Sequence, residues 1–217
     1  MFFVSSKHAE IKNAYTSISP IESPLKNRAV WKVTIAAGFL TVPQMAVLAF
    51  GGVYMKDVLH INLSAISLIL IGVQIGGGIL RIWSGYYTDK NKNRINLLKQ
   101  ISVLGGISSL MLCLFTDSTI IAVLLLILTG LLGHAWHGIA YTETAVKAGV
   151  ERAGTALGMI GTTVFVSSFL TPIMISSILD AYDWIIVWGT VGVLTMTSLL
   201  CFLERTKVKN ASILMVK

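Results

Sequence analysis

The chain has 217 residues, of which 54% are hydrophobic and 12% are charged, and its formal net charge is +7. A soluble globular domain carries roughly 25% charged residues, so this composition excludes a soluble core of this size and indicates a membrane protein. In a soluble protein the positive excess would suggest a nucleic-acid partner. Here the lysines and arginines cluster between apolar runs, which is typical of cytoplasmic loops, and we expect a lipid bilayer and no nucleic acid as the partner.

The first 30 residues are polar and contain Pro20 and Pro24. Their apolar run at residues 1–4 is far shorter than the roughly 7–15 residues that a signal peptide needs. We therefore expect a cytoplasmic segment at 1–30. Cys113 and Cys201 lie inside apolar runs and are interpreted as small hydrophobic residues, so we expect no disulfide, metal site or cofactor.

Six stretches are long and apolar enough to cross a bilayer core about 30 Å thick as helices. Because they are apolar on all sides, they do not fit the alternating pattern of a transmembrane barrel. The expected helices are 33–54, 64–86, 95–115, 119–141, 153–179 and 184–203. The sequence thus predicts an all-α membrane protein, with a six-helix domain at 31–205 and a cytoplasmic tail at 206–217.

The distribution of positive charge predicts the orientation of these helices. Of the 17 lysines and arginines, all but Lys56 precede the first stretch, flank the loops after the second and fourth, or follow the sixth. Since cytoplasmic loops carry the excess of Lys and Arg, both termini are expected in the cytoplasm. The chain is predicted to be a multi-pass protein of the cytoplasmic (inner or plasma) membrane.

The six stretches divide into two sets of three. The loops after the first, third and fifth stretches are short, and the middle stretch of each set is rich in glycine. Gly72 and Gly76 in one set, and Gly154 and Gly158 in the other, form pairs spaced four apart, which permit close helix approach. Two three-helix repeats are typical of secondary transporters.

A glycine, an acid and a basic cluster end the second stretch, at Gly85, Asp89, Lys90 and Arg94. Asp89 is expected to cap a helix N-terminus, where negative charge is favoured. The spacing resembles the signature loop of the major facilitator superfamily, which joins the second and third helices of each half, and Arg81 fits an extension of that pattern. Lys92 stands where the family pattern has a second glycine, so the resemblance leaves the turn geometry there open. The alternative is an ordinary basic hairpin.

A second segment, with Glu143 before Arg152, Gly154 and Gly158, resembles the fourth-to-fifth helix region of the same family, where it implies helix packing and a cytoplasmic gate. The residue pattern of this segment is also similar to that of the family branch that carries small anions such as cyanate and nitrate. The family's unit is two six-helix halves. The resemblance therefore implies the C-terminal half, with residues 1–30 similar to the linker and a second half in a separate chain or a homodimer.

The resemblance implies that the first and fourth helices of a half, helped by the second and fifth, line a substrate cavity. Ionisable groups inside a membrane segment suggest function, and helical spacing places His134, His137 and Tyr141 on one side of the fourth stretch, with Trp136 opposite. The alternative is that both histidines are neutral and bonded to backbone carbonyls. The further candidates are Gln44, Gln74 and Thr162.

These features predict half of a secondary active transporter, a symporter or antiporter, truncated or pairing with itself. It would move a small solute, with a slight preference for an organic or inorganic anion because no Asp or Glu lies deep in the six stretches. The alternative is a non-transporting fragment or structural subunit. An enzyme is not expected, since the two histidines lack a third metal ligand and no Ser/His/Asp set is evident.

Overall fold

The computed structural model describes residues 23–116 and 118–203, so most of the predicted N-terminal segment and the whole predicted tail at 206–217 lie outside the described residues. The helices are α2 (Arg28–Asp57), α3 (Leu63–Asn91), α4 (Arg94–Leu114), α5 (Thr119–Ala135), α6 (His137–Ala148), α7 (Ala153–Ala181) and α8 (Trp184–Phe202). Short 3-10 turns, η1 (Pro24–Lys26) and η2 (Val150–Arg152), precede α2 and α7. Six helices long and apolar enough to span a membrane confirm the predicted all-α class, with α5 and α6 together forming the fourth.

Helix ends extend past the apolar stretches where polar residues cap them. Asn27 accepts a hydrogen bond from the Ala29 amide at 2.9 Å, which starts the first helix at Arg28 instead of residue 33. Asn62 caps α3 in the same way, and Asp183 accepts from two amides of α8. Such caps satisfy amides that lack an intrahelical partner.

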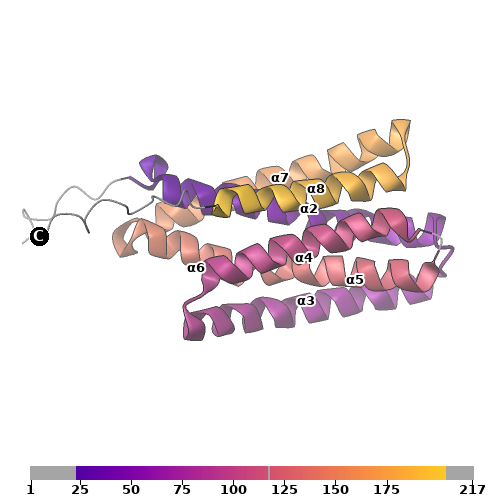
Figure 1. The fold of residues 1–217 in the computed structure, drawn as a ribbon, viewed down its shortest axis with the longest axis horizontal. Coiled ribbons are helices and arrows are strands. Elements are labelled where there is room, and N and C mark those ends of the chain that lie inside the picture. The colour runs from indigo at the N-terminus through magenta and orange to yellow at the C-terminus, as the bar shows by residue number, and fades with distance from the viewer. Residues whose placement is uncertain (1–22, 117, 204–217) are drawn as a thin grey trace, which may run out of the picture.

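The packing of the helices repeats between the two sets of three. Within the described chain, α2 lies against α7 and α8, while α5 lies against α3 and α4, and α4 packs along α8. Each set thus places its first helix between the second and third helices of the other set, with α2 equivalent to the α5–α6 pair. Figure 1 shows the helices side by side along one axis, with the start of α2 and the end of α6 at the same end of the bundle.

Glycines allow α4 and α8 to touch. A Cβ at Gly106 would lie 3.2 Å from the Gly192 carbonyl oxygen, and one at Gly192 would lie 3.0 Å from the Gly106 carbonyl oxygen. The Ser198 hydroxyl also donates to the Ser102 hydroxyl oxygen at 2.7 Å across this pair. In lipid, where apolar contact gives little net drive, small residues and hydroxyl pairs of this kind hold helices together.

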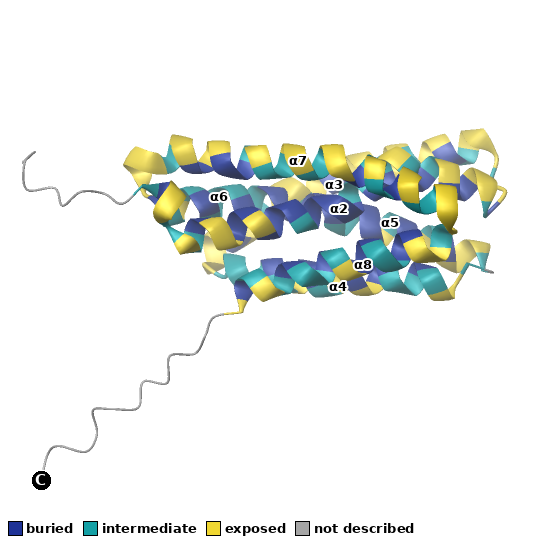
Figure 2. Ribbon diagram, turned by 90° about the horizontal axis from the view of Figure 1, so that it is seen from above, coloured by how far each residue is buried: buried dark blue, intermediate teal, exposed yellow. Residues whose placement is uncertain are grey.

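The six spans differ strongly in how far the chain buries them. In the most apolar part of α2, 61% of the residues are buried, against 17% for α3 and 11% for the span that contains α7. Figure 2 shows α7 largely exposed along its length and α2 largely buried. The helices that are second in each set therefore present most of their surface to the surroundings.

Candidate functional site

The fourth span is interrupted at Trp136, between α5 and α6. A break of this kind leaves backbone carbonyl groups that need partners inside a membrane protein. One partner comes from α3, because the Ser84 hydroxyl donates to the Ala135 carbonyl oxygen at 2.6 Å. The α3 backbone also approaches the start of α6, where a Cβ at Gly138 would lie 3.0 Å from the Arg81 carbonyl oxygen. The break is therefore built into the contact between α3 and the fourth span.

Both candidate histidines are buried at this break. The Nδ1 atom of His134 lies 2.7 Å from the Gly130 carbonyl oxygen, and Nδ1 of His137 lies 3.3 Å from the His134 carbonyl oxygen. Each ring nitrogen would donate in the corresponding tautomer, which is the backbone-bonded arrangement that the sequence left open as the alternative. The imidazole of His137 also stacks on Tyr141, with ring centroids 6.4 Å apart.

The sequence predicts that Trp136 points roughly opposite the histidines, towards packing or lipid; its place in packing is confirmed, but the opposition to His137 is wrong. The two rings stack with centroids 3.9 Å apart, and the Trp136 side chain is fully buried in a cluster that includes Leu98 and Ile139. Adjacent residues of an α-helix are only about 100° apart, and Trp136 keeps right-handed helical dihedrals, with φ −77° and ψ −22°, so its ring can reach the neighbouring imidazole. His137 thus has two aromatic rings beside its imidazole, Trp136 and Tyr141.

Three helices meet just before the break. A Cβ at Gly133 would lie 2.9 Å from Cα of Gln44 and 3.0 Å from its backbone nitrogen, so α2 and α5 touch backbone to backbone. On the other side, a Cβ at Gly77 of α3 would lie 2.6 Å from Cγ of His134. We call this meeting point, formed by Gln44, Gly77, Gly133 and His134, the mid-bundle junction. It brings Gln44 and His134 into the same layer, and Gln44 itself is half-buried.

Gln74 and Thr162, the remaining cavity candidates, lie outside this junction. Both are exposed, Gln74 on α3 and Thr162 on α7, and the Thr162 hydroxyl donates to the Gly158 carbonyl oxygen in its own helix at 2.9 Å. The structure therefore separates the six candidates: two histidines are buried, Tyr141 and Gln44 are half-buried, and Gln74 and Thr162 face outwards.

The signature loop is tied to the fourth span by ion pairs. Arg94 lies 2.7 Å from Asp89 and 3.7 Å from Glu143, and Lys147 lies 3.1 Å from Glu143. Arg94 thus joins the α3–α4 turn to α6. The expectation that Asp89 caps a helix N-terminus is wrong, because Asp89 lies in the last turn of α3 and pairs with a residue of α4, whose N-cap Asn93 makes no side-chain capping bond. Lys90 is exposed and has no ion pair within the described residues.

Lys92 takes the left-handed conformation that a glycine would adopt without strain. Its φ is 53° and its ψ is 31°, and its amide donates to the Thr88 carbonyl oxygen to end α3. Left-handed backbone costs a non-glycine residue roughly 1–2 kcal/mol. The loop therefore keeps its turn although the second glycine of the family pattern is absent.

The glycines expected to pack helices divide into two groups. Gly76 faces Leu131 of α5, where a Cβ would lie at 2.8 Å, whereas a Cβ at Gly72, Gly154 or Gly158 would meet nothing within 4 Å in the described chain. Gly85 also leaves open space at its own Cβ position, and its backbone instead lies near Gly138. Arg152 is exposed and makes no ion pair with Glu143 in this part of the chain.

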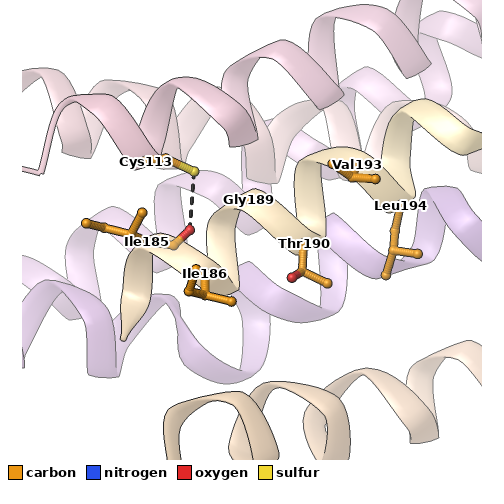
Figure 3. Close-up of a pocket in the computed structure, with 7 residues that line it drawn as sticks. All are labelled: Cys113, Ile185, Ile186, Gly189, Thr190, Val193 and Leu194. Carbon is orange, nitrogen blue, oxygen red and sulfur yellow. Dashed lines mark hydrogen bonds between the residues drawn. The ribbon is translucent and has the colours of Figure 1, made fainter. Parts of the chain in front are cut away.

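An apolar groove of about 440 Å³ lies beside α8, at the end of the bundle opposite the α3–α4 turn. Figure 3 shows Cys113 of α4 at its edge, where the thiol donates to the Ile185 carbonyl oxygen at 3.3 Å. Both cysteines are free and half-buried. Within the described residues no group of three or more His, Cys, Asp or Glu side chains is arranged to hold a metal ion.

Sequence reasoning missed Ser84, Gly133 and Gly138 as parts of the site. Ser84 and Gly138 hold the break at Trp136 against α3, and Gly133 makes the closest backbone contact of the mid-bundle junction. The repeated glycines around His134 and His137 were the available signal, because glycine inside an apolar helix marks close approach of another backbone. Which helix approaches could not be taken from that pattern.

A helical bundle of this kind, with two matching sets of three spans and a charged loop after the second span, is that of an integral multi-pass membrane protein of the transporter type. The model of the Major Facilitator Superfamily matches residues 2–172, and the chain belongs to this family. It is similar to the membrane sensor protein UhpC of Escherichia coli, with 24% identity over 166 residues, covering 74% of this chain and 37% of the relative. The UhpC protein of Salmonella typhimurium is equally similar over 167 residues, with the same coverage.

The chain therefore spans well under half the length of the curated relatives it matches. No solved structure matches it significantly. Neither the family nor these relatives single out the branch that carries cyanate or nitrate, and that assignment stays a prediction.

Proposed function

We propose that these six helices form one half of a pathway for secondary active transport of a small solute, completed by a second six-helix unit. The observation that carries the proposal is a row of exposed polar side chains on α3. Ser67, Gln74 and Arg81 recur at seven-residue spacing on this helix, and all three are exposed. A charged or amide side chain facing lipid inside a membrane is costly, so this face is better matched to water or to protein than to acyl chains.

The equivalent helix of the second set has a similar face. Thr155, Gly158 and Thr162 are exposed on α7, and no side chain of the described chain covers the two exposed glycines of this helix, Gly154 and Gly158. Small residues permit close approach of another helix. Because α3 and α7 occupy equivalent places in the two sets, both uncovered faces fit one partner unit, whether a second copy or a different six-helix half.

The charges favour an anionic substrate. Arg81 lies beside the break in the fourth span, where its backbone carbonyl approaches Gly138. Among the described residues, the carboxylates lie near the ends of the spans or in the turns between them, at Asp57, Asp89, Glu143, Glu151, Asp180 and Asp183. The gathering of basic residues at the end that holds the α3–α4 turn supports a cytoplasmic location for this end.

Cysteine accessibility tests whether these faces line a water-filled pathway. In a background with Cys113 and Cys201 replaced by serine, we expect cysteines at positions 74 and 162 to react rapidly with a charged, membrane-impermeant thiosulfonate. Matched controls are Leu104→Cys and Leu200→Cys, whose native side chains are 53% and 65% exposed but lie on α4 and α8, the third helix of each set. We expect these controls to remain unmodified because they face lipid.

Equal protection at all four positions would contradict the pathway. A second measurement addresses the need for a partner: the six helices alone, reconstituted as demonstrated monomers, should show no saturable uptake of any anion. Robust uptake by such monomers would refute the half-pathway.

A second candidate is ligand sensing without transport, favoured by the similarity to UhpC, which is named a membrane sensor protein. The two functions separate in one preparation, because a sensor would bind its ligand saturably in a complete assembly while vesicles show no flux of that ligand. A fragment or structural subunit would do neither.

A further inference from the structure

A second groove, of about 580 Å³, lies at the basic end of the bundle, where α2, α4, α6 and α8 begin or end. Its polar part is formed by Arg28 and Lys32, one turn apart on α2, and by Lys147 at the end of α6. The Asn27 side chain donates to the Lys147 carbonyl oxygen at 3.2 Å, which fixes the start of α2 against α6. We call this the basic groove.

The electrostatics of the basic groove favour an anion. Its lining holds three cationic side chains and, among the described residues, no carboxylate. Lys147 shares its charge with Glu143 at 3.1 Å, so Arg28 and Lys32, which make no ion pair in the described part of the chain, supply most of the free charge. The N-terminal end of α2 adds the positive pole of a 30-residue helix.

The rest of the lining is apolar. Val33, Ile95, Phe202 and Leu203 form this wall together with the Cys201 thiol, and Leu203 is 61% exposed. A free inorganic anion has no apolar surface, so contact with this wall would not stabilise its binding. An amphiphile does, because its charged part pairs with the cations while its hydrocarbon covers apolar surface that would otherwise meet water.

We propose that the basic groove binds an anionic phospholipid. Its phosphodiester lies at Arg28 and Lys32, and the part of an acyl chain next to the headgroup lies against Phe202 and Leu203. Basic pockets between helices at the cytoplasmic level of a membrane suit such headgroups. The site lies at the basic end of the bundle, away from the mid-bundle junction. It does not depend on the proposed transport function.

Lipid titration followed by native mass spectrometry in neutral detergent tests the charged part of the site. We expect phosphatidylglycerol to bind more tightly than phosphatidylcholine, and the double variant R28Q/K32Q to lower its association constant about 30-fold, which corresponds to about 2 kcal/mol for two cations. The matched control K26Q/K99Q removes the same charge from the same end but outside the groove lining, and should leave binding within about threefold.

Equal losses in the two double variants, or equal affinity of the unaltered protein for both lipids, would overturn the proposal. The swap R28K/K32R keeps both charges and should bind like the unaltered protein. Retained elution volume and melting temperature show that each variant is folded.

The two cysteines give a test that needs no substitution. Cys201 lines the basic groove, while Cys113 lies at the other end of the bundle. Saturating phosphatidylglycerol should slow alkylation of Cys201 by N-ethylmaleimide and leave Cys113 unchanged, as followed by peptide mass mapping. Equal protection of Cys201 by glycerol 1-phosphate, which has the headgroup charge without acyl chains, would show a free-anion site and overturn the lipid assignment, as would no protection by either.

Discussion

Replacement of Gly133 by alanine tests the mid-bundle junction. The new Cβ would lie 2.9 Å from Cα, 3.0 Å from the backbone nitrogen and 3.1 Å from Cβ of Gln44, against 3.4–4 Å for ordinary contact. Because two of these are backbone atoms of α2, no rotamer change relieves the overlap, and α2 must move away from α5. Overpacking of this kind costs about 1–3 kcal/mol.

The matched control is Gly105→Ala on α4, where a Cβ would lie 3.5 Å from the Thr195 methyl group and 3.9 Å from Leu132, which is ordinary contact. Both variants gain about 0.5–1 kcal/mol from replacing glycine inside a helix. Gly105→Ala should therefore be neutral or stabilising, and Gly133→Ala should be less stable than it by about 1–3 kcal/mol. The difference isolates the contact with Gln44 from the common helix term.

The free energy of unfolding is measured for both variants by titrating folded protein in mixed micelles with a denaturing detergent, followed by tryptophan fluorescence. If Gly133→Ala is as stable as Gly105→Ala, the backbones of α2 and α5 do not meet at Gln44, and the reasoning fails. If Gly133→Ala is fully folded but a cysteine at position 74 no longer reacts with the thiosulfonate, the substitution changes the pathway and not the stability of the fold.

Three further substitutions test the charged end of the bundle. Lys92→Gly should raise the free energy of unfolding by roughly 1 kcal/mol, because a glycine adopts the left-handed conformation without strain, and an unchanged or lower value would contradict the assigned turn. Arg94→Gln should lower the free energy of unfolding by up to about 1 kcal/mol, because both carboxylate partners are lost. The control Lys90→Gln breaks no ion pair seen in the described residues and should leave it unchanged. Equal effects of the two variants would show that Arg94 acts by charge alone. Gly149→Ala should cost roughly 1–3 kcal/mol, since Gly149 has φ 81° and ψ 159°, a region that is nearly exclusive to glycine; a thermal melt that matches the unaltered protein would refute this.

Six membrane helices could be predicted because the bilayer imposes a length and a hydrophobicity on each span and forbids unpaired backbone in lipid. The signature loop was predictable for a similar reason, since Gly85, Asp89, Lys90 and Arg94 are close in sequence and act over one short turn. The pairing of Arg94 with Glu143 was not, because Glu143 lies about 50 residues further along the chain and reaches Arg94 only through the packing of α6 on α3 and α4.

The candidate site shows the limit of periodicity. Regular spacing placed His134, His137 and Tyr141 on one face and Trp136 on the other, but the Trp136 ring stacks on its neighbour His137. The carbonyl of Ala135, just before the break, accepts a hydrogen bond from the Ser84 hydroxyl of α3, and no local pattern connects Ser84 to residue 135. Likewise, Lys92 does not resemble a turn glycine in the sequence, yet it takes the left-handed conformation that ends α3.

The sequence by itself determined that this protein crosses a membrane six times, that its basic residues gather between the spans, and that its two sets of three helices resemble those of the major facilitator superfamily. Only the tertiary structure decided which faces are free: α2 is enclosed, whereas α3 and α7 leave Gln74, Arg81 and Thr162 uncovered. The physical reason is that the length and apolar composition of a segment suffice for it to span the bilayer. Whether one of its faces is covered depends on which other helices pack against its glycines and hydroxyl groups.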